Sequence, residues 1–236
     1  MQDAYDVLSY LPWTSDICGF DNSDPLPTVA TYASRSWLTT IHEDQMLDLL
    51  RHDLLLRGSK AEIENMAFFP KLREGYNQRN TGQYNEAQTF VRARSVGEAL
   101  VAGERDGLGM MANINDNHWV ALAIDFQKSV ISYGDPFNKP PLLEITSVVN
   151  WWTFHHTGQE FSYQKMKVSP QQDGFSCGLL SPNALGHFYL PMEIPLINTA
   201  DVNKERVRVL LRVVKQHLDQ VEVCQKYVQI ENKHSH

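Results

Sequence analysis

The chain has little cysteine, and the few cysteines form no metal or disulfide pattern. Its 236 residues include Cys18, Cys177 and Cys224, and no two of these are spaced as a CxxC pair. An odd number of unpaired thiols argues against a disulfide framework and against a zinc site. We therefore expect a reducing compartment, the cytosol or the nucleus, and neither a metal nor another cofactor. One free thiol is then available as a catalytic nucleophile.

Long apolar runs and an excess of basic charge are also lacking. No stretch approaches the ~20 apolar residues of a membrane span. Residues 1–20 contain three aspartates and no Lys or Arg, unlike a signal peptide. The net charge is -7 and the pI about 5.7, whereas non-specific nucleic-acid binding needs a basic surface. We expect no membrane and no nucleic acid among the partners, while a protein with a basic face remains possible.

The order of predicted elements is helices, then strands, then helices, which favours a single α+β domain with a mixed sheet. Periodic leucines predict a helix over 37–56, with Thr40 as its cap and Glu43 and Asp44 in its first turn. The polar stretch 73–88 is expected to be a loop. Apolar runs predict strands at residues 110–114, 119–126, 130–133 and 161–168, and a long amphipathic helix at 202–228. We divide the chain into an extended N-terminal arm packed on the domain, the domain itself and a disordered tail, at residues 1–35, 36–230 and 231–236.

Cys177 stands in the sequence QQDGFSCG, directly after a loop and before a predicted helix. A helix N-terminus or a cationic imidazole stabilises the thiolate, which is the nucleophilic form of cysteine. Gly174 and Gly178 allow backbone conformations that a bulky residue would resist. These neighbours suit a nucleophile, although a lone cysteine is more often a buried structural residue. Pro182 is awkward inside the predicted helix because it removes a backbone donor.

His118 begins a predicted strand, and Asp135 follows the end of the next strand, 17 residues later. If the two strands pair as a hairpin, both residues lie at the same edge of the sheet. The carboxylate could then hold one ring nitrogen and leave the other to face a thiol. A surface histidine and a loop-capping aspartate are the alternative interpretation.

Gln171 lies six residues before Cys177, and its side-chain amide could donate to an oxyanion together with the Cys177 backbone N–H. A solvated loop glutamine is the alternative. Other histidines have no orienting partner in the sequence, so we interpret His155, His156 and His187 as structural. The spacing of His42, Asp48 and His52 does not indicate a metal site, and we expect these three residues on a solvated helix face.

Together these residues resemble the ubiquitin-like-protein protease family, the SUMO proteases and their relatives in the papain-like superfamily. The resemblance lies in His118-Trp119, Asp135, and the pattern Gln-x-(Asp/Asn)-Gly-x-x-Cys-Gly at 171–178, in that order. Trp37-Leu38 before a helix is similar to the family's Trp-Leu-Asn-Asp opening. The match extends over residues 37–218. It implies a papain-like cysteine protease fold with a mixed central sheet flanked by helices and the nucleophile at a helix N-terminus.

The resemblance also implies an activity and a partner. A member of this family is an isopeptidase that cleaves after the C-terminal Gly-Gly of a ubiquitin-like modifier, from a precursor or from a lysine-linked conjugate. The expected triad is Cys177, His118 and Asp135, with Gln171 at the oxyanion. Trp37 and Trp119 would form a slot that admits only glycines, beside Gly178. Neither a cofactor nor a second copy of the chain is expected.

Three departures from the family pattern leave the modifier open. Thr40 stands where the SUMO proteases have an aspartate that pairs with a basic residue of SUMO, Ser176 replaces another aspartate, and Pro182 lies in the nucleophile helix. SUMO is the default modifier, with ubiquitin or another Gly-Gly protein as alternatives. Two other functions remain: an acyltransferase of the same fold, which would need a basic acyl-CoA pocket, and a non-catalytic module that binds a modifier.

Overall fold

The computed structural model describes the backbone of residues 2–234 and the side chains of residues 5–223. Within that part of the chain, no helix has the length and apolarity to cross a membrane. The elements in chain order are α1 (Gln2–Ser9), η1 (Leu26–Ala33), α2 (Thr40–Leu56), β1 (Glu62–Ile63), α3 (Phe68–Asn77), α4 (Gln83–Glu86), η2 (Gln88–Phe90), α5 (Val91–Val101), β2 (Leu108–Ile114), β3 (His118–Asp125), β4 (Val130–Gly134), α6 (Leu143–Thr157), β5 (Ser162–Lys165), α7 (Cys177–Tyr189), η3 (Thr199–Asp201) and α8 (Val202–His234).

Five strands form one mixed sheet in the order β1-β2-β3-β4-β5. β2, β3 and β4 are antiparallel to one another, whereas β1 and β5 are added in parallel at the two edges. β2 and β3 are buried along almost their whole length, which is typical of strands covered on both faces. The predicted α+β class with a mixed sheet is confirmed.

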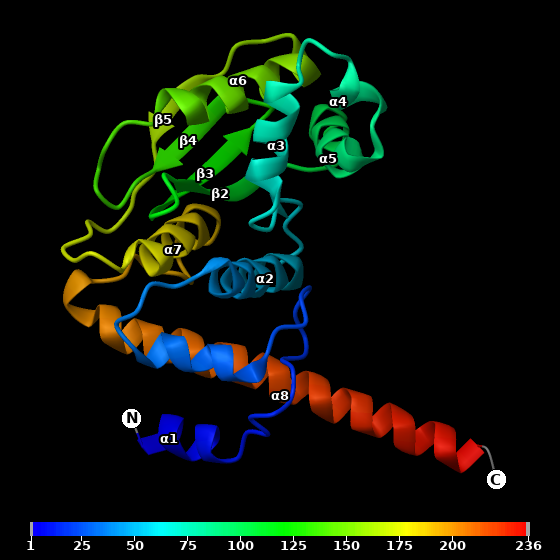
Figure 1. The fold of residues 1–236 in the computed structure, drawn as a ribbon, viewed down its shortest axis with the longest axis vertical. Coiled ribbons are helices and arrows are strands. Elements are labelled where there is room, and N and C mark those ends of the chain that lie inside the picture. The colour runs from blue at the N-terminus through cyan, green and yellow to red at the C-terminus, as the bar shows by residue number, and fades with distance from the viewer. Residues whose placement is uncertain (1, 235–236) are drawn as a thin grey trace.

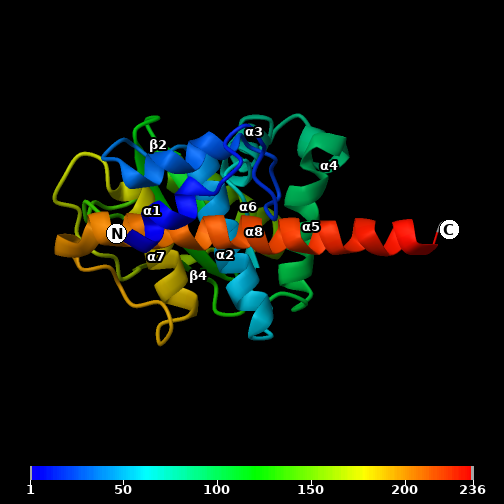
Figure 2. The same ribbon diagram turned by 90° about the horizontal axis from the view of Figure 1, so that it is seen from below.

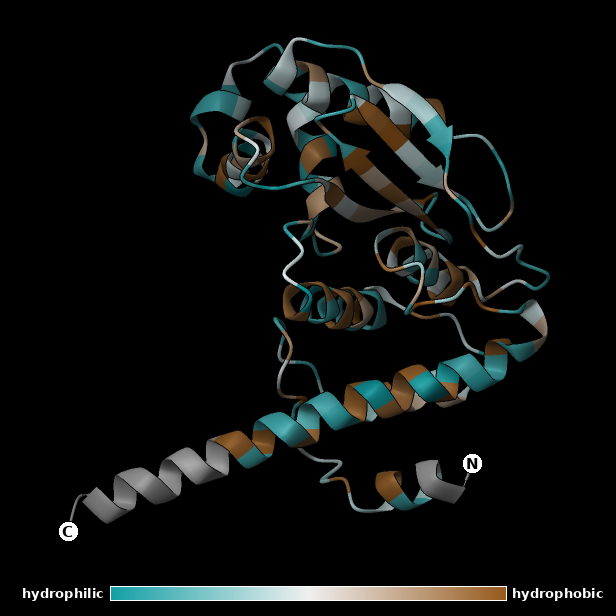
Figure 3. Ribbon diagram, turned by 180° about the vertical axis from the view of Figure 1, so that it is seen from behind, coloured by the Kyte–Doolittle hydropathy of each residue, from teal (hydrophilic) through white to brown (hydrophobic). Residues whose placement is uncertain are grey.

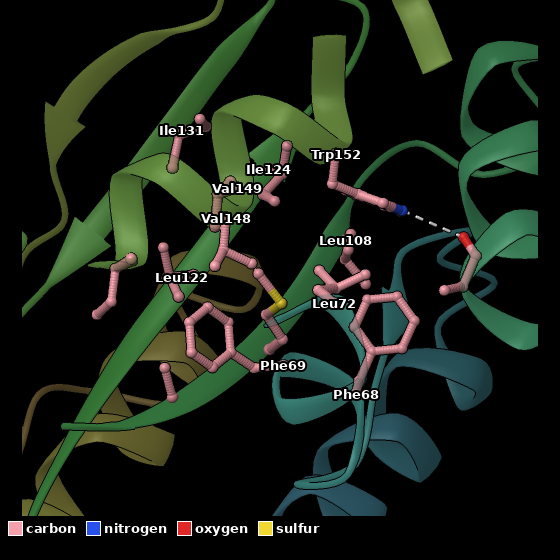
Figure 4. Close-up of a cluster of buried hydrophobic side chains, with 14 of the residues drawn as sticks. Phe68, Phe69, Leu72, Leu108, Leu122, Ile124, Ile131, Val148, Val149 and Trp152 are labelled. Carbon is pink, nitrogen blue, oxygen red and sulfur yellow. Dashed lines mark hydrogen bonds between the residues drawn. The ribbon is translucent and has the colours of Figure 1, made fainter. Parts of the chain in front are cut away.

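Helices cover both faces of this sheet. α3, α5 and α6 lie on one face, and α7 lies on the other with α2 behind it (Figure 1). Figure 3 shows hydrophobic residues in the strands and in parts of the helices that pack beneath them. On the first face Trp152 of α6 meets Phe68 of α3 edge to face, with ring centroids 5.8 Å apart, near Leu108 of β2 (Figure 4). The second face carries α7, which begins at Cys177.

The long helix α8 forms a further layer beneath α2 (Figures 1 and 2). η1 packs along it, and Leu26, Val29 and Tyr32 of η1 are buried with Leu210 and Val213 of α8. This apolar contact joins the start of the chain to its last third. It also fixes the segment that follows η1 and leads to Trp37.

The N-terminal 35 residues are helical in part and not wholly extended, because α1 and η1 lie within them. The remainder is held by an isolated bridge between Asp16 and Pro25. The side chains of residues 224–236 lie outside the described part of the structure. The predicted domain limits and the predicted tail at 231–236 therefore stay predictions.

The start of α2 differs from the expectation. Thr39, not Thr40, is the N-cap, and it exchanges hydrogen bonds with His42 in a capping box. His42 is buried, so the expected solvated face is wrong for this residue. Glu43 and Asp44 are also buried, with exposed fractions of 0% and 9%. They are enclosed because residues 42–50 of α2 lie between α7 and α8.

One further expectation fails for reasons of packing, while the predicted helix after Cys177 is confirmed in spite of Pro182. The predicted loop 73–88 contains the end of α3 and all of α4, because Phe69 and Leu72 bury the α3 face against the sheet. Gly75 lies within α3 and is packed against Tyr84 and Trp151, which leave no room for a side chain at this position. α7 also continues unbroken from residue 177 to 189 through Pro182.

Candidate active site

The hairpin of β3 and β4 brings His118 and Asp135 together. Ala121 pairs with Gly134 in the antiparallel register, so the residues just beyond lie at one edge of the sheet. The distance between His118 Nε2 and Asp135 Oδ1 is 2.7 Å, and both residues are buried. Asp135 Oδ1 also accepts from the backbone N–H of Phe137, at 2.7 Å. The predicted proximity of the two side chains is confirmed.

Cys177 is the first residue of α7, a buried free thiol on the side of the sheet that faces α2. The Cys177 thiol is a hydrogen-bond partner of the His118 imidazole. Burial lowers the pKa of His118, but the hydrogen bonds with Asp135 and with the Cys177 thiol outweigh burial and raise this pKa to about 9. Since Nε2 is engaged with Asp135, Nδ1 is the nitrogen left for the thiol.

The Asp135 carboxyl is held in its ionised form. Burial raises its pKa, but the hydrogen bonds from His118 and from the Phe137 backbone N–H more than compensate, so that the net pKa is lowered. A carboxylate that accepts donors on a buried imidazole fixes the ring orientation and favours the imidazolium. His118 therefore stands between an ionised Asp135 and the Cys177 thiol, with its ring oriented by the carboxylate.

The loop before α7 is hydrogen-bonded to Pro136, the residue after Asp135. The backbone N–H of Gln171 donates to the Pro136 carbonyl at 2.8 Å, and its side-chain Nε2 donates to the Asp173 carbonyl at 2.8 Å. The same Nε2 also lies 3.5 Å from Asp173 Oδ1, so both contacts of the amide nitrogen are with Asp173. The Asp173 bond also fixes the amide with its nitrogen, rather than its oxygen, toward that carbonyl.

Asp173 shapes the turn into the nucleophile helix. Its Oδ1 accepts from the backbone N–H of Phe175 and of Ser176, at 3.0 and 2.8 Å, and its Oδ2 accepts from the Ser176 hydroxyl at 2.5 Å. Burial raises the Asp173 pKa, but these bonds together lower it, so the group is ionised. Asp173 was not singled out in the sequence as a site residue, although its position in the Gln-x-Asp-Gly pattern is a signal for this turn.

The two tryptophans occupy different environments. Trp119 is buried, and its Nε1 donates to the Leu38 carbonyl at 3.3 Å. Trp37 is half exposed and lines a cavity of about 430 Å³ together with His118 and Gly174. Trp37 thus lies beside His118 and Asp135, whereas Trp119 lies against Gly178, the residue after Cys177.

Gly178 is required for space and not for backbone conformation. A methyl group at this position would overlap Glu43 Oε1 and lie 3.0 Å from Leu38 Cβ and 3.3 Å from the Trp119 ring. Gly174 has open space around it, and neither glycine has a positive φ. The expectation that both allow unusual backbone conformations is therefore wrong. Thr40 is exposed at the start of α2.

Phe137 is a site residue that the sequence did not reveal. Its ring stacks on the His118 imidazole, with centroids 4.6 Å apart and an interplanar angle of 23°. It lines the same cavity as Trp37 and His118, and Lys139 Nζ lies 5.4 Å from the ring centroid. No pattern in the sequence signals a stack of this kind, because it depends on the path of the loop after β4.

The remaining histidines are bonded elsewhere. His156 Nε2 lies 2.9 Å from the Tyr84 hydroxyl, and His187 Nδ1 lies 2.8 Å from the Ile194 carbonyl. Burial, followed by the charge of His155, lowers the pKa of His156 to about 4. These contacts agree with the structural interpretation. His42 Nε2 lies 3.0 Å from the Thr28 carbonyl, which ties α2 to η1.

Among the comparisons with known proteins, only the comparison with solved structures finds matches. No protein-family model matches the chain, and no curated protein matches it in sequence. The chain is similar to the C-terminal Ulp1 protease domain solved in complex with Smt3, the yeast ortholog of SUMO, with a TM-score of 0.67 and 18% identity over 91% of this chain and 95% of that one.

Two other solved structures have the same architecture. A de-sumoylating protease superposes with a TM-score of 0.64 and 11% identity over 94% of this chain and 98% of that one. The Chaetomium thermophilum Ulp1-like SUMO protease catalytic domain matches with a TM-score of 0.59 and 15% identity over 76% and 73%. At these identities the likeness concerns the fold, which is that of the Ulp1-like protease domains and agrees with the papain-like fold predicted from the sequence.

Proposed function

We propose that this protein is a cysteine peptidase that cleaves after the C-terminal Gly-Gly of a ubiquitin-like modifier. The observation that carries this proposal is the arrangement of a buried cysteine at the start of α7 beside an imidazole that is itself bonded to Asp135. The fold of the Ulp1-like protease domains supports it.

The reaction follows from the geometry of the three side chains. In the reactive pair the Cys177 proton already resides on His118 Nδ1, because the His118 pKa is about 9, and the thiolate attacks the carbonyl of the terminal glycine. The imidazolium, stabilised by Asp135, then gives its proton to the departing lysine amine. Water, deprotonated by the neutral imidazole, hydrolyses the thioester and regenerates the thiol.

Two donors are available for the oxyanion of the tetrahedral intermediate. The backbone N–H of Cys177 begins α7, where no side chain caps the helix, and we expect Gln171 Nε2 to exchange its longer contact, 3.5 Å to Asp173 Oδ1, for the oxyanion. We expect Gln171→Ala to raise the barrier by about 2–4 kcal/mol. A change below twofold in kcat/KM would mean that Gln171 only supports the loop.

The modifier tail is proposed to enter between Trp37 and Trp119. A chain of glycines suits this position because Leu38, Trp119 and Gly178 are already in close contact there. The partner class is then a ubiquitin-like protein and its lysine-linked conjugates. Since Cys177 must stay reduced to react, we expect the enzyme to act in the cytosol or the nucleus.

Active-site probes test the proposal directly. A panel of ubiquitin-like proteins with C-terminal electrophiles should yield one adduct on Cys177, identified by peptide mass spectrometry. Cys177→Ala should abolish the adduct and lower turnover by about 10⁴-fold or more while the fold is kept. Near-normal turnover by Cys177→Ala would overturn the assignment, as would a panel in which no modifier reacts.

The choice of modifier is a separate question. Thr40 has no charge with which to steer a basic residue of the modifier, and it is exposed where such a residue would arrive. SUMO remains the default and ubiquitin the alternative. Matched C-terminal fluorogenic substrates distinguish them: a thousandfold preference for SUMO would show that recognition lies outside Thr40, and a preference for ubiquitin would point to Thr40 and α2.

The acyltransferase alternative has less support. Of the residues that line the cavity beside His118, Lys139 is the only Lys or Arg. Acyl-CoA carries several phosphates, which call for a cluster of basic groups. A binding measurement with acyl-CoA checks this point.

A further inference from the structure

A carboxyl group that the proposed reaction does not use lies behind the nucleophile. Glu43 of α2 is 0% exposed, and neither of its oxygens has a hydrogen-bond partner among the residues that the structure describes. Its Oε1 rests against Gly178, in the first turn of α7, where even a methyl group would overlap it. A polar group this deeply enclosed is destabilising unless it is neutral or paired.

Charged and titratable groups face Glu43 from each element around it. Cys177 on α7, Asp44 on its own helix and Tyr32 on η1 are acids, and Arg206 on α8 is the nearby base. Arg206 donates through Nε and Nη2 to the carbonyls of Tyr32, Thr31 and Ser36. Its Nη1 is buried without a partner, and no ion pair joins it to Glu43 in the described part of the chain.

The surroundings therefore favour the neutral form of Glu43. Burial is the largest influence and raises its pKa well above the usual range, and the nearby Cys177 and Asp44 raise it further, whereas Arg206 lowers it. The interaction with Cys177 is reciprocal, because two negative charges in a buried site oppose each other. A charged Glu43 would also weaken the helix N-terminal field that favours a thiolate.

We propose that Glu43 is a positioning residue for the Cys177 thiolate: it carries a proton in the resting enzyme, and its ionisation and that of Cys177 oppose each other. This inference rests on the proposed function only in calling Cys177 the nucleophile. It concerns how the nucleophile is maintained, not what is cleaved, and it is tested without any substrate.

The experiment uses the whole chain with Cys18 and Cys224 replaced by serine, so that Cys177 is the single thiol. Infrared difference spectra between this protein and its Glu43→Gln variant should contain the C=O stretching band of a protonated carboxylic acid at pH 7. The pH at which this band disappears should fall by about one unit or more in Cys177→Ser, because the opposing thiolate charge is gone. Alkylation of Cys177 with iodoacetamide should produce the same displacement.

Asp53→Asn is the matched control, since Asp53 lies ten residues further along α2, is partly exposed and pairs with Arg212 at 2.7 Å. It should leave the band and its pH dependence unchanged. If Glu43→Gln fails to fold, the band is followed by pH titration in the single-thiol protein and in its Cys177→Ser variant, and the two titrations are compared.

Two results would overturn the proposal. Absence of the band at pH 7 would show that Glu43 is a carboxylate, compensated by Arg206. A band whose pH dependence is the same with and without a thiol at position 177 would show that the two groups are independent. Neither result depends on a modifier, so failure here is distinct from a failure of every modifier probe to label Cys177.

Discussion

The pKa of His118 sets the pH above which the proposed activity should fall. Its pKa of about 9 means that the imidazolium persists until the pH rises through that value. We expect kcat/KM to fall along a limb near pH 9, measured with a fluorogenic modifier substrate. Asp135→Asn should move this limb toward lower pH, because the Asp135 bond raises the His118 pKa. If the alkaline limb of kcat/KM stays at the same pH in Asp135→Asn, the limb does not report the ionisation of His118.

The same shift has a consequence for stability. A folded-state pKa above the unfolded value of about 6.5 means that the folded protein holds this proton more tightly. The resulting stabilisation is complete below about pH 6.5 and is lost as the pH rises through about 9. Asp135→Asn should therefore lower the unfolding temperature more at pH 6 than at pH 10.

Asp135 and His118 differ in what their loss should do to the rate. The imidazole moves the proton, whereas the carboxylate orients and stabilises it. We expect His118→Ala to reduce kcat/KM more than Asp135→Asn. Single-turnover rates on one substrate compare the two, and a wild-type rate in Asp135→Asn would remove Asp135 from the triad.

Phe137 stacks on the imidazole, and this contact should affect the rate in a graded way. Replacement by alanine removes an aromatic pair worth about 0.5–1.5 kcal/mol, equivalent to about a two- to twelvefold loss in kcat. Phe137→Tyr keeps the ring and should restore most of the activity. A rise in KM alone, with kcat unchanged, would assign Phe137 to substrate contact rather than to the imidazole.

The residue-scale predictions from the sequence succeeded where chain spacing determines geometry. A hairpin of known length fixes the neighbourhood of His118 and Asp135, and the start of a helix fixes that of Cys177. Phe137 could not be found in this way, because its position depends on a loop. Glu43 could have been found, since residues 43, 47, 50 and 54 recur on one helix face, and a charge in that apolar row indicates a buried acid.

At the scale of elements, α2 and α7 pack so closely at Gly178 that no additional carbon atom fits between them. Gly178→Ala should destabilise the protein by about 1–3 kcal/mol through overpacking against Glu43, Leu38 and Trp119. Gly174→Ala, three residues before Cys177, should change stability by less than about 0.5 kcal/mol, because nothing lies within 4 Å of its added methyl group.

Thermal or urea unfolding of these two variants measures the difference. A second change, Glu43→Ala, should partly restore Gly178→Ala, because it removes the oxygen that the new methyl group meets. Equal destabilisation by the two glycine replacements would contradict the close contact.

Elements were predicted well where apolar periodicity is strong and poorly where packing decides. The strands and α8 follow directly from their patterns. α3 was missed because its polar face and Gly75 resemble a loop in the sequence, and only its burial against the sheet makes it a helix. α7 persists through Pro182 in the same way, since it is enclosed by β3 and α2 on both sides.

At the scale of the whole molecule, Arg206 links the last helix to the approach to the site. Its guanidinium donates to the carbonyls of Thr31, Tyr32 and Ser36, and Ser36 directly precedes Trp37. Arg206→Met leaves these buried carbonyls without their donors. We expect a loss of about 2–4 kcal/mol in the free energy of unfolding.

Arg208→Ala is the control for this measurement. Arg208 is exposed on the same helix and pairs only with Glu205 at the surface, so its replacement should cost less than about 1 kcal/mol. If Arg206→Met is no more destabilising than Arg208→Ala, the carbonyls around residues 31–36 are supported without the guanidinium.

The dependence of the site on Arg206 also has a consequence for biosynthesis. A chain is made from its N-terminus, and the groups assembled around the nucleophile become available in the order Trp37, His118, Cys177, Arg206. A nascent chain that has exposed its thiol still lacks the arginine that secures the segment before Trp37. Proteolytic competence should therefore appear late in synthesis, so that ribosome-bound chains stalled before residue 206 are inert toward the modifier probes that label the finished enzyme.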